Sequence, residues 1–150
     1  MTRAELAAIY RRAAYRVQLE EDLAVDLVVG ARCPGLDQWL SSRGARSWGF
    51  LTAVNPGSRR LAEEENRIRL ARLVGRLRES GCELRAGVGL DPAGEWPPEP
   101  SFLVVGASTE ALAAWAAEFD QAAFLLGTLG GPPQLVFVEP AAQAPPARSV

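Results

Sequence analysis

Two short stretches of this 150-residue chain contain most of the side chains that could bind a ligand. NPGSRRLAEEEN (residues 55–66) holds both asparagines and joins an apolar run to a helical pattern. GLDPAGEWPPEPS (residues 89–101) combines carboxylates with a tryptophan among prolines. A helix that begins inside the first stretch leaves free N–H groups at its positive end, where an anion is favoured. These features predict either a site for a small anionic or nucleotide-like ligand or a well-capped connector whose arginines are solvated.

The candidate ligand-binding side chains come from both stretches and from the start of a later strand. Asn55 and Ser58 would hold the anionic group, and Arg59 or Arg69 would pair with it through a planar fork. Trp96 would stack on the ligand. The full set is Asn55, Ser58, Arg59, Asn66, Arg69, Asp91, Trp96, Glu99 and Gln121.

Glu99 is the best candidate for a catalytic acid–base, because a partly buried carboxylate can have its pKa raised toward neutrality. Whether the protein is an enzyme stays open, since Glu99 could equally be a salt-bridge partner. Asn66 lies on the apolar stripe of its predicted helix, so its amide either fastens the preceding loop or faces a ligand. Replacing Asn66 by Ala should abolish ligand-induced thermal stabilisation without unfolding the protein. Trp96 is either a lid on the core or a stacking surface.

The composition excludes several chemistries. The chain has no histidine, and all sixteen basic residues are arginine, so it cannot contain a Ser-His dyad, a Schiff-base lysine or a P-loop lysine. Asp91, Glu99, Glu65 and Asp120 would suit only a hard ion such as magnesium, and they lack a recognised metal-ligand spacing. We therefore predict neither a metal nor a cofactor. The net charge of −2 argues against nucleic acid as a partner.

Length and composition predict one α+β domain over residues 1–139 and a flexible Pro- and Ala-rich tail over residues 140–150. Cys33 and Cys82 stand alone, and the N-terminus does not resemble a signal peptide, so a reducing cytoplasm is indicated. No apolar run approaches the length of a membrane span, so we expect no membrane association.

Hydrophobic periodicity predicts most of the helices and strands. Helices are expected over residues 3–14, 36–42 and 61–80, and a further one is capped by Ser108. Strands are expected over residues 15–19, 24–29, 48–54, 82–88, 101–106, 122–126 and 134–138. Gly87 and Gly89 inside one of these strands indicate a bulge or a close backbone approach.

From residue 48 to residue 126 the order is strand, helix, strand, strand, helix, strand. That order is typical of a ferredoxin-like split βαβ core, here with an N-terminal helix and extra strands. In such a sheet the ends of the first two strands share an edge with the starts of the last two. The two polar stretches, Ser101 and Asp120-Gln121 all fall on that edge.

These ordered motifs also indicate a family. TAxNPxS appears as Thr52 to Ser58 and EEN as Glu64 to Asn66; GxGxDPxGxW appears as Gly87 to Trp96, ExSFLVxG as Glu99 to Gly106 and FxQxA as Phe119 to Ala123. Over roughly residues 8 to 137 the chain resembles the bacterial domain-of-unknown-function family 3293. The resemblance implies a small soluble protein and supplies no catalytic residue. Ala62 stands where a capping Ser or Thr would be expected before Glu65.

Two classes of function stay open. The first is a cytoplasmic protein that binds a small anionic ligand between the two polar stretches. The second is a homodimer or an adaptor without a ligand, paired through an edge strand or a helix face. Ile68 lies opposite the core stripe of its helix and would be exposed at such an interface.

Overall fold

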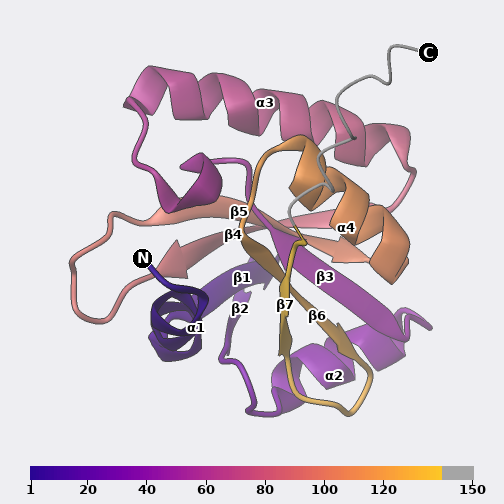
Figure 1. Ribbon diagram of the computed structural model, residues 1–150. Helices are drawn as coiled ribbons and strands as arrows, with labels where there is room; N and C mark the ends of the chain where they lie inside the picture. Colours follow the sequence, from indigo (N-terminus) through magenta and orange to yellow (C-terminus); the bar gives the residue numbers. More distant parts are fainter. Residues whose placement is uncertain (140–150) are drawn as a thin grey trace, which may run out of the picture.

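The computed structural model describes residues 1–139, which form four α-helices and a seven-stranded antiparallel sheet (Figure 1). The helices are α1 (Arg3–Arg12), α2 (Pro34–Ser42), α3 (Glu63–Glu79) and α4 (Thr109–Glu118), and η1 (Pro56–Ser58) is a short 3-10 turn. The strands are β1 (Ala14–Glu20), β2 (Leu23–Leu27), β3 (Ser47–Leu51), β4 (Glu83–Leu90), β5 (Glu99–Val105), β6 (Ala123–Thr128) and β7 (Gln134–Phe137). The expected tail over residues 140–150 lies outside the described residues.

The α+β class and the predicted order of elements are confirmed. Between β3 and β6 the chain runs strand, helix, strand, strand, helix, strand. The sheet order is β2-β1-β4-β5-β3-β6-β7, and every neighbouring pair is antiparallel. The strand of residues 48–54 ends early, at Leu51, because the chain turns away before Asn55.

Each face of the sheet has its own core. On one face α3 and α4 pack through residues such as Leu73 and Leu112 (Figure 1). On the other face α2 packs through Leu36 and Leu40, and α1 lies beside it. The central strand β3 is buried on both faces, as its nearly continuous apolar sequence predicts.

The helix starts follow local capping chemistry. The Ser108 side chain accepts a hydrogen bond from the Ala111 N–H at 3.1 Å, which confirms the predicted cap of α4. Thr2 and Glu5 form a capping box at α1. At α3 the N-cap is Ala62, which offers no side-chain acceptor, and three glutamates occupy the first turn instead. Those carboxylates already complement the positive end of the helix.

The sheet curls around α1 and α2, so its two outer strands approach each other (Figure 1). Although α1 leads directly into β1, its Tyr10 ring makes an edge-on contact with Phe137 of β7, with centroids 6.4 Å apart. The Gly30 N–H, just beyond β2, donates to the Pro133 carbonyl of the turn before β7 at 2.9 Å. The curl places α1 over the ends of several strands.

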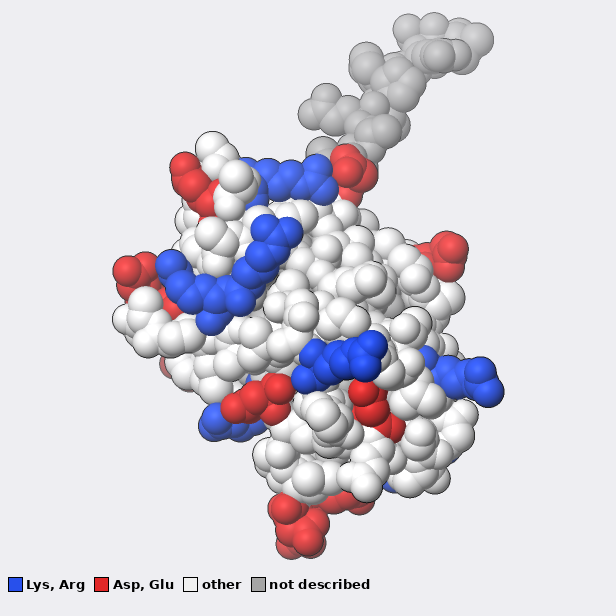
Figure 2. Space-filling model, turned by 90° about the horizontal axis from the view of Figure 1, so that it is seen from below, with Lys and Arg blue, Asp and Glu red and all other residues white. Residues whose placement is uncertain are grey.

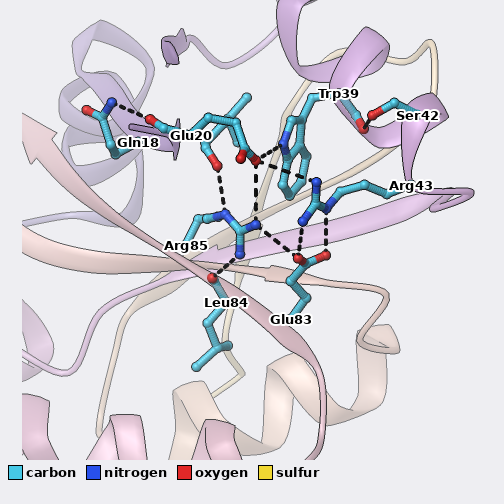
Figure 3. A network of polar contacts seen from close by, with 9 residues as sticks. Gln18, Glu20, Trp39, Ser42, Arg43, Glu83, Leu84 and Arg85 are labelled. Carbon is cyan, nitrogen blue, oxygen red and sulfur yellow. Dashed lines mark hydrogen bonds and ion pairs between the residues drawn. The ribbon is translucent and has the colours of Figure 1, made fainter. Parts of the chain in front are cut away.

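A network of charges fastens α2 to β1 and β4 (Figure 3). Arg43 donates two hydrogen bonds to the Glu83 carboxylate, at 2.8 and 2.5 Å. The Trp39 Nε1–H donates to Glu20 at 2.8 Å. The guanidinium groups of Arg43 and Arg85 lie 4.5 and 5.1 Å from the Trp39 ring. The hydrogen bond from Trp39 is the largest cause that lowers the pKa of Glu20.

One strand glycine is explained by a close backbone approach. A Cβ at Gly87 would lie 2.8 Å from the Arg16 carbonyl oxygen of β1 and 2.6 Å from the Phe50 ring. The pairings of β4 with β1 and β5 stay in register, so the expected alternative, a bulge, is wrong. Within residues 1–139, no helix is both long and apolar enough to cross a membrane.

Candidate functional site

The polar residues gather at one edge of the sheet, which we call the loop edge: here β3 and β4 end and β5 and β6 begin. Hydrogen bonds join segments that are distant in the sequence. The Asn55 Nδ2–H donates to Glu99 Oε2 at 2.6 Å. The Gly57 N–H donates to the Asp120 carbonyl at 2.7 Å, and Gln121 Nε2 donates to the Val54 carbonyl at 3.1 Å.

Asn55 is the centre of this network. It is only 5% exposed. Its backbone N–H donates to Asn66 Oδ1 at 2.9 Å, and Asn66 Nδ2 donates back to Asn55 Oδ1 at 2.8 Å. The Leu61 N–H donates to the same Asn55 oxygen at 3.0 Å. The two asparagines thus fix the loop between β3 and α3, and the remaining Asn55 N–H group fixes the Glu99 carboxyl.

The loop edge also contains unusual backbone conformations. Within residues 1–139, the non-glycine residues with positive φ are Asn55, Ser58 and Asp120, at 49°, 62° and 55°. Each such conformation costs on the order of 1–3 kcal/mol, and such residues cluster at functional sites. The network around Asn55 holds the first of them in place.

A pocket of about 70 Å³, the α1 pocket, opens beside this network. Its walls come from α1, β1, the loop before α3, the end of β4 and the following loop, and the starts of β5 and β6. The lining residues are Leu6, Ile9, Tyr10, Ala13, Tyr15, Asn55, Ser58, Gly89, Leu90, Asp91, Trp96, Pro97, Glu99 and Gln121. Glu99, Tyr10, Tyr15 and Gln121 also border a smaller inner cavity of about 40 Å³.

Burial changes the acid–base properties of the pocket. The pKa of Glu99 is raised because the carboxyl is desolvated, and the hydrogen bond from Asn55 opposes this only in part. Burial likewise raises the pKa of the Tyr10 and Tyr15 phenols, and the nearby Glu99 charge adds to both shifts. The Tyr15 hydroxyl donates to the Tyr10 carbonyl at 2.9 Å.

A larger groove of about 510 Å³, the α3 groove, lies on the other side of Asn55. Asn55 and Pro97 line both cavities, so they form part of the wall between them. The groove's charged lining residues are Arg60, Glu63 and Arg67, and Asn66 lies among them. Arg67 is paired with Glu64 at 2.5 Å.

Most of the predicted binding residues reach the α1 pocket. These are Asn55, Ser58, Asp91, Trp96, Glu99 and Gln121. Asn66 lines the α3 groove, where its amide holds Asn55. Arg59 is exposed and lines neither cavity.

Two predicted residues organise the backbone. The Arg69 guanidinium donates from Nε to the Ala53 carbonyl at 2.7 Å and from Nη2 to the Phe119 carbonyl, so it ties the end of β3 to the end of α4. The Asp91 carboxylate accepts from the backbone N–H groups of Ala93, Glu95 and Trp96 at 3.0–3.1 Å, which shapes the loop after β4.

Sequence reasoning missed the wall that α1 and β1 contribute. Tyr10 fits the apolar stripe of the first helix, and Tyr15 fits a buried strand position, so both read as ordinary core residues. Their place in the pocket follows from the pairing of Tyr15 with Gly89, which brings β1 beside the end of β4. Nothing local in the sequence specifies that pairing.

The fold and the loop edge define an α+β protein whose polar residues surround a pocket where four central strands end or begin. Residues 51–124 match the model of the family described as "Protein of unknown function (DUF3293)". The resemblance seen in the motifs is confirmed. The match contains every predicted binding residue but not α1 or β1. No curated protein and no solved structure shows a significant match to the chain.

Proposed function

We propose that this protein binds a small molecule in the α1 pocket through the carboxyl of Glu99. The observation that carries the proposal is the fixed, partly buried position of that carboxyl at the pocket wall. Asn55 holds Oε2, and Asn66 and Leu61 in turn hold Asn55. A pocket with apolar walls and a few fixed polar groups is the usual form of a ligand site.

The aromatic side chains support the same site. Trp96 lines the α1 pocket next to Pro97, and the Arg60 guanidinium lies 5.5 Å from its ring. Arg60 also donates to the Glu95 carbonyl at 3.1 Å, so the arginine supports the loop that carries Trp96. The tryptophan is therefore held at the pocket without being packed into the core.

An anionic or nucleotide-like ligand would belong to the α3 groove. Arg60 and Arg67 line the groove, whereas the residues that line the α1 pocket include no arginine. Glu63 also lines the groove, and the first turn of α3 is acidic. These negative charges weaken the attraction of the groove for an anion. On the side of the molecule where α1 and α2 lie, basic and acidic side chains are interspersed (Figure 2).

Two finer statements belong to the proposal. The segment from β3 to β6 would be a ferredoxin-like split βαβ core, supported by the inner strand order β4-β5-β3-β6 with α3 and α4 on one face. A reducing, cytoplasmic setting is supported by Cys33 and Cys82, which are both free thiols.

Gly89 offers a direct test. It lines the pocket, and a Cβ there would lie 3.7 Å from the Tyr15 ring, which is ordinary contact. A Cβ is therefore accommodated at this position, and the two methyl groups of Gly89→Val, which extend beyond it, should occupy part of the pocket; native near-ultraviolet circular dichroism checks that the variant folds. A thermal-shift screen of small neutral, anionic and cationic compounds should give hits that stabilise the wild type but not this variant. Hits that stabilise both equally, or no hits at all, would refute the proposal.

The homodimer or adaptor remains a second candidate because of one observation. Ile68 of α3 is 46% exposed, as the sequence predicted. Sedimentation analysis of the wild type and of Ile68→Glu tests this second function. A wild-type dimer that the substitution dissociates would support it. A wild type that stays monomeric at high concentration would refute it.

A further inference from the structure

We infer that the α1 pocket selects a small cationic group, a primary or methylated ammonium, which pairs with Glu99 against the tyrosine rings. This inference rests on the proposed function and adds the ligand's chemical class. It reverses the charge that the sequence suggested for the ligand. The reason is the kind of side chain that lines the pocket.

The charged residues that line the α1 pocket are both acidic, and three of its lining residues are aromatic. Glu99 and Asp91 supply carboxyls, and Tyr10, Tyr15 and Trp96 supply rings. Aromatic rings combined with a carboxylate are the usual means of binding ammonium groups, because the ring face is electronegative.

Glu99 is a partly buried glutamate whose hydrogen-bonding partner is neutral, unlike Glu83 and Glu64, which pair with arginines. Glu83 accepts two hydrogen bonds from Arg43, and Glu64 pairs with Arg67 at 2.5 Å. The side-chain donor to Glu99 is the neutral amide of Asn55. A partly buried carboxylate without a counter-charge is costly, and a bound cation would supply that charge.

Asp91 is a weaker partner than Glu99. Three backbone N–H groups already occupy its oxygens, and the charge of Arg12 acts on it as well. Arg60 likewise lies over Trp96. A cation is thus directed to the side of the pocket where Glu99, Tyr10 and Tyr15 lie.

The size of the pocket limits the group that enters it. The α1 pocket is small, with a cavity volume of about 70 Å³. That space suits an ammonium head bearing small alkyl groups. Any longer chain on the ligand would leave past the apolar wall that Leu6 and Ile9 form.

The pH dependence has a definite sign. Groups around Glu99 come from α1 (Tyr10), β1 (Tyr15), the loop before α3 (Asn55) and the turn before β6 (Gln121). Asp91 lies further along the wall, and the charge of Arg12, which does not line the pocket, acts on Asp91. The tyrosines titrate well above neutrality because burial raises the pKa of both. The cation pairs with ionised Glu99, so affinity should strengthen as the pH rises through the raised pKa of this carboxyl.

Calorimetric titrations with n-butylammonium, choline and the neutral choline isostere 3,3-dimethylbutan-1-ol test the inference. Wild-type protein should bind at least one ammonium probe at least tenfold more tightly than the neutral isostere, and more tightly at pH 8 than at pH 5. Glu99→Gln keeps an oxygen for Asn55 and should weaken ammonium binding at least tenfold. Gly89→Val should block all probes.

The outcomes separate this inference from the proposed function. If neutral compounds bind in a manner that Gly89→Val blocks, while ammonium probes do not bind, the proposed function stands and the cationic class is wrong. If nothing binds, both fail. Unchanged ammonium affinity in Glu99→Gln, checked for native near-ultraviolet circular dichroism, also overturns the inference. If that variant does not fold, the pH dependence of wild-type binding decides instead: affinity that is flat between pH 5 and 8 overturns it.

Discussion

Asn66→Ala should destabilise the protein by a predictable amount. The substitution removes the acceptor of the Asn55 backbone N–H and the donor to Asn55 Oδ1. A buried N–H left without a partner costs about 1–3 kcal/mol. The second loss costs about 1 kcal/mol, because Asn55 Oδ1 still accepts from the Leu61 N–H at 3.0 Å. The two losses together amount to about 2–4 kcal/mol.

That cost should leave the protein folded. Domains of this size have a free energy of unfolding of about 5–15 kcal/mol. Because each kcal/mol of lost stability lowers Tm by about 2–4 °C, Tm should fall by on the order of 10 °C. Because the Asn55 network also fixes Glu99, ligand-induced stabilisation should weaken in the same variant.

Urea unfolding at pH 7, monitored by tryptophan fluorescence, measures the change in the free energy of unfolding. Arg59→Ala is the matched control, since Arg59 belongs to the same loop but is exposed. The control should lie within about 0.5 kcal/mol of the wild type. The reasoning is wrong if Asn66→Ala also lies within that margin at an unchanged m-value, because the two asparagines would then contribute nothing to stability.

Three further predictions concern other parts of the molecule. The raised pKa of Glu99 means that its contribution to stability is fully present below the ordinary carboxyl range and is lost as the pH rises through the raised value. Glu99→Gln should abolish that loss. The free energy of unfolding of the variant should therefore rise relative to that of the wild type from pH 4 to pH 8. Parallel curves of the two free energies against pH would contradict this. Trp39→Phe removes the hydrogen bond that lowers the pKa of Glu20. The variant should have a lower urea midpoint at pH 7, and a gap to the wild type that narrows as the pH falls through the carboxylate range; a constant gap would argue against this role. Gly75→Ala should stabilise by about 0.5–1 kcal/mol, since Gly75 lies in α3 with open space where a Cβ would be. Gly49→Ala should instead destabilise by about 1–3 kcal/mol, since its Cβ would lie 2.3 Å from a leucine side chain of α4; equal effects of the two alanines on Tm would exclude this packing account.

The local architecture could be predicted because its causes are local. Ser108 caps α4 because its hydroxyl accepts from a backbone N–H three residues away. The apolar run that forms β3 predicts a strand buried on both faces, and it is one. The loop edge could also be predicted, since strand order alone decides which strand ends meet.

The roles of single polar residues were harder to predict. Arg69 has the chemistry to bind an anion, but its guanidinium is held in place by hydrogen bonds to the Ala53 and Phe119 carbonyls. Asp91 could face a ligand, but its oxygens accept from three N–H groups of its own loop. A side chain and a free backbone group find each other only after folding, so residue type and spacing cannot assign these pairs.

The sequence by itself determined the class of fold, the positions of the elements and the exclusion of histidine and lysine chemistry. It also determined that Asn55, Glu99 and Gln121 would lie at one edge. Only the tertiary structure decided that Tyr10 and Tyr15 complete the pocket, because the curl of the sheet and the pairing of β1 with β4 bring them there. That same packing surrounds Glu99 with rings and leaves it without an arginine, since burial and charge environment arise from contacts between distant segments.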